Sequence, residues 1–149
     1  MSLTEKISGD LINAMKGKDK VALEAIRAAK TAFLLAKSEK VQDAGLTSEE
    51  ELKIIQKLVK QRRESAAIYK ENNRQDLYDK EVAEADVLEK YLPAKMGETE
   101  LEKVLKDIIV RVGASSPAEM GIVMGVATKE LAGKADGKEI SAIVRRLLG

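Results

Sequence analysis

The chain of 149 residues contains no cysteine and no histidine. Without cysteine it forms no disulfide and no thiolate metal site, a composition that fits a reducing compartment. Without histidine it lacks the usual general base near neutral pH and the commonest metal ligand. Aromatic residues make up only 3% of the chain, so the core must be built from aliphatic side chains. We expect neither a metal nor another cofactor.

Long apolar runs are also absent. No stretch approaches the length of about 18 apolar residues that a membrane-spanning helix requires. The opening segment, Met1-Ser-Leu-Thr-Glu-Lys6, lacks the apolar run of a signal peptide. We therefore expect a cytoplasmic protein without a membrane partner.

Charge of one sign is not in excess either. The chain carries 26 basic and 25 acidic residues, with a net charge of +1. A domain that binds nucleic acid strongly usually carries more positive charge than this. Any contact with RNA would therefore depend on local clusters of cations.

The sequence does contain clear signals for the starts and ends of helices. There are only two prolines, and no run of alternating β-branched residues suggests a strand. Capping residues and apolar stripes of helical period instead predict an all-α protein. The expected N-caps are Ser2, Asp19, Thr47, Asp76, Ser116 and Asp136. The expected helices cover residues 3–16, 20–41, 48–72, 76–92, 98–112, 117–131 and 137–148.

The grouping of these helices predicts two domains. Residues 20–41 and 48–72 form two long helices joined by a short turn that contains Gly45, which favours an antiparallel hairpin. Pro93 and Gly97 interrupt the pattern within the segment from Leu92 to Glu98, the best candidate for a boundary. We expect a long-helix hairpin or bundle over residues 1–93 and a small three-helix domain over residues 97–149.

No catalytic residue can be named. No serine lies in a G-x-S-x-G elbow or an S-x-x-K motif, and the chain has neither a P-loop nor a G-x-G-x-x-G segment. These absences argue against the familiar nucleophilic and phosphate-binding sites, so we do not expect the chain alone to be an enzyme.

The helix over residues 48–72 carries the first candidate binding residues. Lys53, Lys57 and Lys60 lie opposite its apolar face, where they either contact phosphates or form a solvated surface. Arg62 instead falls on the apolar stripe and needs a carboxylate partner. Glu81 or Glu84 in the next helix, or Asp76 at its start, would provide a structural ion pair.

The C-terminal region carries the second set of candidates. Gly121 and Gly125 share one helix face, where each costs roughly 1 kcal/mol relative to alanine. The two glycines indicate either close helix packing within the domain or a bare backbone surface that faces a ligand. The turn Gly133-Lys-Ala-Asp-Gly-Lys138 is explained by capping, but it also places cations beside a helix N-terminus, a plausible phosphate site. The candidate cations here are Lys134, Lys138, Arg145 and Arg146, of which the two arginines could instead complement the helix dipole.

Several of these segments together resemble the YqeY family. The first are the string Lys60-Gln-Arg-Arg-Glu-Ser65, then Arg74-Gln-Asp-Leu77, and Tyr91-Leu-Pro93. Tyr69, Glu81 and Glu84 stand at the intervening positions, and Met120-Gly-Ile-Val-Met-Gly125 and the glycine-bounded turn over residues 133–138 complete the pattern. The resemblance covers essentially the whole chain. It departs mildly at Arg63, and at Asn73, where family members often have glycine.

The resemblance implies an N-terminal helical domain followed by a small helical C-terminal domain. It also implies relatedness to the tail of the B subunit of the tRNA-dependent aspartyl/glutamyl-tRNA amidotransferase and to a domain of some glutaminyl-tRNA synthetases. Those regions are thought to contact tRNA while the chemistry lies elsewhere. The leading hypothesis is thus a non-catalytic tRNA- or RNA-binding adaptor. One alternative is a protein-interaction module that docks on an amidotransferase or synthetase subunit. A weaker alternative is a carbon–nitrogen ligase that uses glutamine as amido-N-donor, although the amide-transfer and ATP-handling domains are absent.

Overall fold

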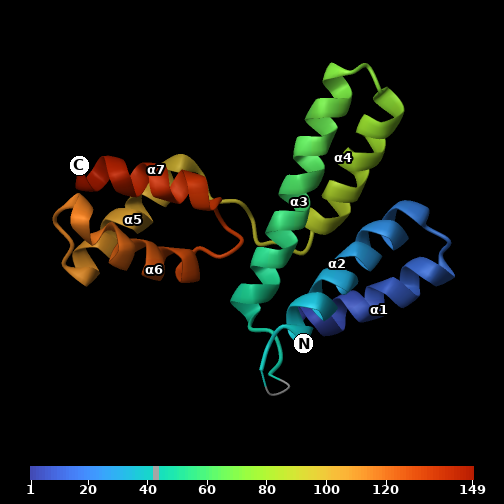
Figure 1. Cartoon of the computed structure of the whole chain (residues 1–149), viewed down its shortest axis with the longest axis horizontal. Coiled ribbons are helices and arrows are strands. Elements are labelled where there is room, and N and C mark those ends of the chain that lie inside the picture. Colours follow the sequence, from blue (N-terminus) through green and yellow to red (C-terminus); the bar gives the residue numbers. More distant parts are fainter. Residues whose placement is uncertain (42–43) are drawn as a thin grey trace. The chain divides into compact units, whose positions relative to one another are not determined.

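The computed structural model describes residues 1–41 and 44–149, and all regular secondary structure in these residues is helical (Figure 1). This confirms the all-α prediction. The chain divides into two compact units, Met1–Leu92 and Pro93–Gly149, and each has its own hydrophobic core. The elements are α1 (Leu3–Lys16), α2 (Lys20–Ser38), α3 (Ser48–Glu71), α4 (Gln75–Glu89), α5 (Glu98–Val112), the 3-10 turn η1 (Pro117–Glu119), α6 (Met120–Glu130) and α7 (Gly137–Leu148).

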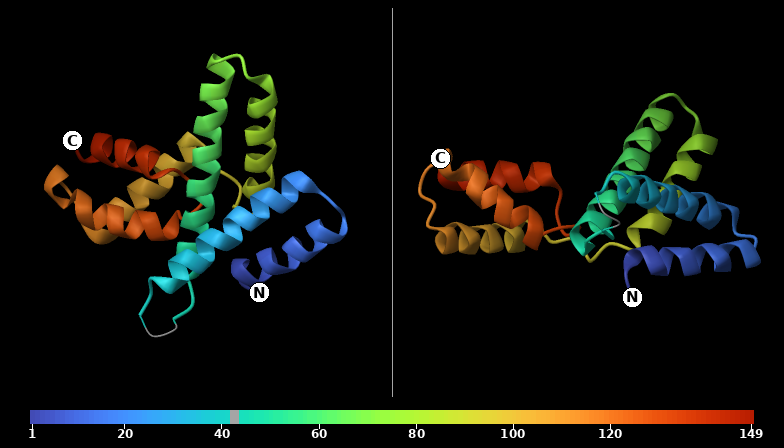
Figure 2. Two further views of the ribbon diagram at one scale, coloured as in Figure 1. Left: turned by 45° about the vertical axis from the view of Figure 1, so that its right-hand side comes forward. Right: turned by 60° about the horizontal axis from the view of Figure 1, so that its bottom comes forward.

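Two antiparallel pairs of helices build the first unit, α1 with α2 and α3 with α4, and α2 also packs against α4 (Figure 2). The chief partner of α3 is therefore α4, whereas we expected a hairpin of α2 and α3. The short connection between α3 and α4 explains this pairing, because Asn73 adopts a left-handed conformation with φ of 57° and turns the chain back on itself. Large side chains at the centre of the unit include Phe33, Ile55 and Leu88.

Most helix starts follow from local capping. The hydroxyl of Ser2 accepts from the backbone N–H of Glu5, and Thr47 with Glu50 forms a reciprocal capping box at the start of α3. Asp19 caps α2 in the same way by accepting from the N–H of Ala22.

Several helix limits in the first unit differ from the sequence prediction, among them the end of α4, which lies at Glu89 and not at residue 92. Helix α2 ends at Ser38 and not at Val41, and the hydroxyl of Ser38 donates to the carbonyl oxygen of Leu35. Helix α4 begins at Gln75 with Arg74 at the N-cap position. Asp76 does not cap it, because its carboxylate accepts hydrogen bonds from the Arg74 side chain instead.

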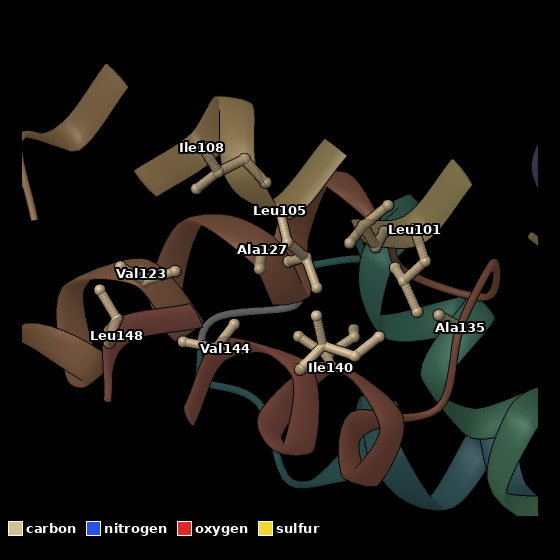
Figure 3. Close-up of a cluster of buried hydrophobic side chains, with 11 residues drawn as sticks. Leu101, Leu105, Ile108, Val123, Ala127, Ala135, Ile140, Val144 and Leu148 are labelled. Carbon is tan, nitrogen blue, oxygen red and sulfur yellow. The ribbon is translucent and has the colours of Figure 1, made fainter. Parts of the chain in front are cut away.

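The second unit is a three-helix assembly whose aliphatic side chains converge between α5, α6 and α7 (Figure 3). Leu101, Leu105 and Ile108 come from one face of α5, at the spacing of an amphipathic helix. Val144 from α7 is buried among them, as is Val123 from α6. The expected second helix of this unit opens as the 3-10 turn at Pro117 and becomes α-helical only from Met120. The side chain of Ser116 does not cap it.

Candidate nucleic-acid interface

The basic residues of α3 are largely engaged with acidic neighbours. Lys53 Nζ lies 2.8 Å from Glu49 Oε1, one turn earlier on the same helix. Lys60 is half-buried, and Lys57 is exposed and makes no ion pair within residues 1–41 and 44–149. Arg63, further along the same helix, is also paired, because its Nη2 lies 2.8 Å from Asp86 Oδ1 and also contacts Glu89. Of the three lysines that the sequence singled out on α3, Lys57 is thus the most available for a ligand.

Arg62 faces α4, and its guanidinium is held by Glu84. Arg62 Nε lies 3.4 Å from Glu84 Oε1, and the two side chains are 16% and 9% exposed. The guanidinium also reaches the carbonyl oxygen of Leu58. Within the described residues, Glu81 forms no ion pair with Arg62, and Asp76 pairs with Arg74. The pair joins the two helices inside the unit.

A different set of cations lies on α7 and the turn before it. Gly133 has a φ of 76°, which lets the chain turn after α6, and the carbonyl oxygen of Lys134 accepts from the N–H of Met96. Asp136 then caps α7 by accepting from the N–H of Lys138. The turn that precedes α7 is therefore held by a hydrogen bond at each end.

Three exposed side chains on this surface carry unneutralised positive charge. Lys134, Lys138 and Arg145 are exposed, and none forms an ion pair within the described residues. Lys138 and Arg145 are seven positions apart and so share one face of the helix. Arg146 points elsewhere, since its guanidinium lies 3.5 Å from Glu102 Oε2 on α5. We refer to Lys134, Lys138 and Arg145 as the α7 basic surface.

The two glycines of α6 are not explained by packing within their unit. Gly121 and Gly125 are both exposed, and a Cβ atom added to either would have no neighbour within 4 Å. Of the two explanations weighed above, close packing within the domain is therefore wrong. Ile122, which is 59% exposed, lies beside these glycines on the same side of the helix. The result is an open surface of bare backbone and one aliphatic side chain.

Sequence reasoning missed a buried carboxylate that ties α3 to α1. Glu51 is only 2% exposed, and its Oε2 accepts from the backbone N–H and the hydroxyl of Thr4 at 2.7 Å and 2.6 Å. A signal for it exists, because Glu51 occupies the same helical stripe as Ile55 and Val59. Its carboxylate lies at the N-terminus of α1, where the helix dipole favours negative charge.

The structure also bears on membrane-spanning helices and on metal sites. None of the helices in the described residues is long and apolar enough to cross a membrane. Within residues 1–41 and 44–149, histidine, cysteine and acidic side chains do not gather in groups of three that could hold a metal ion.

The described residues thus form an all-α protein of two helical units, each with its own core, and the C-terminal unit is a small three-helix domain. A scan of family models matches residues 4–148 to the Yqey-like protein family, and the chain belongs to that YqeY family. The resemblance proposed from the sequence motifs is thus confirmed. A curated relative is "Altered inheritance of mitochondria protein 41, mitochondrial" from Pyrenophora tritici-repentis. It is 31% identical over 151 residues, which cover 97% of this chain and 80% of the relative.

Proposed function

We propose that this protein is a non-catalytic adaptor that binds tRNA or a similarly structured RNA through phosphate contacts. The observation that carries the proposal is the α7 basic surface, where Lys134, Lys138 and Arg145 are exposed and form no ion pair with any residue that the structure describes. Cations that are not neutralised by the protein's own carboxylates can exchange condensed counterions for contacts with RNA phosphates. The resemblance to tRNA-contacting domains supports the same assignment.

The pattern of ion pairs favours the second unit as the main contact. On α3, Lys53 already holds Glu49, so this lysine would lose an existing partner on binding phosphate. Arg146 is similarly engaged by Glu102. Lys57 remains as an additional contact from the first unit. A small number of free cations predicts modest affinity that depends on ionic strength.

Binding to total tRNA across a salt series tests the proposal. Fluorescence anisotropy should show log K falling linearly with log salt concentration, because phosphate contacts release counterions. The triple variant Lys134→Ala/Lys138→Ala/Arg145→Ala should weaken binding and reduce the slope by about two to three, since each phosphate contact contributes about 0.7–0.9.

The matched control is Lys103→Ala. Lys103 is an exposed lysine of the same unit without an ion pair, but it lies on the side of α5 opposite the buried Leu101 and Leu105. This variant should bind as the wild type does. Absence of binding at about 50 mM salt, or binding that does not respond to salt, would refute the proposal.

The open glycine surface of α6 favours a second candidate, a module that docks on a protein subunit of an amidotransferase or synthetase. Exposed Gly121 and Gly125 would let a partner approach the helix backbone closely, and Ile122 would supply apolar contact. Affinity capture after nuclease treatment separates the two functions. A purified candidate subunit that binds wild-type protein but not an Ile122→Glu variant would favour docking over RNA binding.

We propose from the composition alone that the protein acts in the cytoplasm. The name of the fungal relative contains the word mitochondrial, so the mitochondrion is the alternative location. Fractionation of cells that express a C-terminally tagged chain would decide between them.

A further inference from the structure

A pocket lies beside the α7 basic surface within the second unit. It has a volume of about 370 Å³, near the lower end of the range of roughly 300–1,000 Å³ for small-molecule pockets. Met96, Leu101, Ala142 and Ile143 supply an aliphatic lining. Leu101 and Ile143 belong to the hydrophobic core of the unit, so this lining is held in place by packing.

Helical geometry connects the pocket to the basic surface through Ala142. Lys138, Ala142 and Arg145 follow one another along one face of α7 at helical spacing. Ile143 lies about a third of a turn further round, so Ala142 stands between the cations and the pocket. A chain whose phosphates contact Lys138 and Arg145 would therefore have its bases within reach of the pocket.

The rim of the pocket carries an available hydrogen-bond acceptor. Lys95 Nζ lies 3.5 Å from Glu139 Oε1, so these two rim residues engage each other. Glu98, at the start of α5, also lines the pocket and forms no ion pair within the described residues. An ionised carboxylate only accepts hydrogen bonds, and it therefore selects ligands that carry an N–H donor. It repels the phosphates themselves, which leaves them to the cations of α7.

We propose that this pocket receives one unstacked nucleobase that bears an exocyclic amino group, which Glu98 binds. The proposal rests on the RNA-binding function given above and specifies the kind of RNA. Single-stranded loops and ends present such unstacked bases, whereas a regular duplex does not. A carboxylate accepts from the exocyclic amine of cytosine but has no such donor in uracil. The aliphatic walls pack against the flat faces of the ring.

Cytosine and uracil oligomers of equal length provide a matched pair of probes, because the two bases differ only at position 4 and at N3. Cytosine carries the N4 amino donor beside an N3 acceptor, whereas uracil carries the O4 carbonyl oxygen beside an N3–H, and that oxygen repels a carboxylate. Full-length protein should bind oligocytidylate more tightly than oligouridylate, by roughly five-fold or more. Glu98→Ala should abolish this preference without weakening the binding of oligouridylate, because the variant removes a carboxylate that repels phosphate and removes no cation. The control is Glu100→Ala, because Glu100 is another exposed acid of the first turn of α5 but does not line the pocket.

A second variant tests the shape of the pocket independently of its charge. Ala142→Leu should narrow the pocket and also remove the preference for cytosine, and leucine is well tolerated in a helix. Circular dichroism would verify that both variants stay folded.

The possible failures can be told apart. Equal, salt-dependent binding of the two oligomers by wild-type protein would overturn the base pocket and leave the phosphate contacts standing. A cytosine preference that survives in Glu98→Ala would also overturn it. Failure of both oligomers and of total tRNA to bind would overturn this inference together with the proposed function.

Discussion

Tyr91 links the end of the first unit to its beginning. Its hydroxyl donates to Asp10 Oδ2 of α1 at 2.5 Å, although the two residues are 81 positions apart. Lys6 Nζ lies 5.6 Å from the centre of the same ring, within the range of a cation–π contact. The aromatic side chain that precedes Pro93 thus anchors the end of the unit on α1.

This contact makes the stability of the first unit sensitive to alkaline pH. Burial, with the hydrogen bond to the Asp10 carboxylate, raises the pKa of Tyr91 above its ordinary value of 10.0. A raised folded-state pKa contributes stability that is fully present below pH 10 and is lost as the pH rises above it. Tyr91→Phe should cost about 0.5–1.5 kcal/mol at pH 7, the usual worth of one hydrogen bond. Because the variant has no group to ionise, its free energy of unfolding should then fall less than that of the wild type between pH 9 and 11. Urea unfolding at each pH would measure both effects, and parallel profiles would contradict the assignment.

At the scale of single elements, α6 is notable because it contains two exposed glycines, which are poor helix formers. Gly121 lies in the first turn of α6 and Gly125 near its middle, and nothing fills the space beside either glycine. On folding, each glycine loses more backbone conformational entropy than alanine would. No packing contact of the glycine within the unit offsets that loss. Packing within the unit therefore does not account for either glycine.

Alanine at these positions should stabilise the second unit. Gly121→Ala and Gly125→Ala should each raise its free energy of unfolding by about 0.5–1 kcal/mol, because alanine is the better helix former and meets no atom within 4 Å. The control is Gly113→Ala. A Cβ there also has free space, but Gly113 ends α5 with a φ of 72°, so this substitution should destabilise. Thermal unfolding followed by circular dichroism would rank the three variants, and destabilisation by the α6 substitutions would mean that the glycines are needed for folding.

At the scale of the whole molecule, the two separate cores predict two folding units. The core of Met1–Leu92 and that of Pro93–Gly149 share no residue. Domains of 55–65 residues can fold alone, so even the smaller unit is large enough. Each fragment should therefore be helical and should unfold cooperatively.

Expression of the two fragments tests this and also locates the RNA contact. The fragment of residues 93–149 should retain most of the affinity for total tRNA, because it carries the α7 basic surface. The fragment of residues 1–92 should bind weakly, with Lys57 as its exposed, unpaired α3 lysine. Circular dichroism would first show whether each fragment is helical. Fluorescence anisotropy would then measure the affinity of the folded fragments for total tRNA. Strong binding by the first fragment alone would contradict the assignment of the interface to the second unit.

The sequence by itself determined the helices and the family. Caps such as Thr47 with Glu50, and apolar stripes such as Leu101, Leu105 and Ile108, act over a few residues, so they can be recognised without knowing what a helix packs against. The differences at the end of α2 and at the start of α4 are also local, since Ser38 bonds back to Leu35 and Asp76 accepts from the Arg74 side chain.

Only the tertiary structure decided which cations are free and where a ligand can enter. Arg63 is held by Asp86 from the next helix, and Arg146 by Glu102 from α5, through contacts that no local spacing reveals. The pocket of the second unit likewise joins Glu98 of α5 to Ala142 of α7, which the packing of these two helices brings together. Charge pairing and cavities depend on side chains from distant positions in the chain, whereas capping and periodicity depend on neighbours, and this difference separates what could be foreseen from what could not.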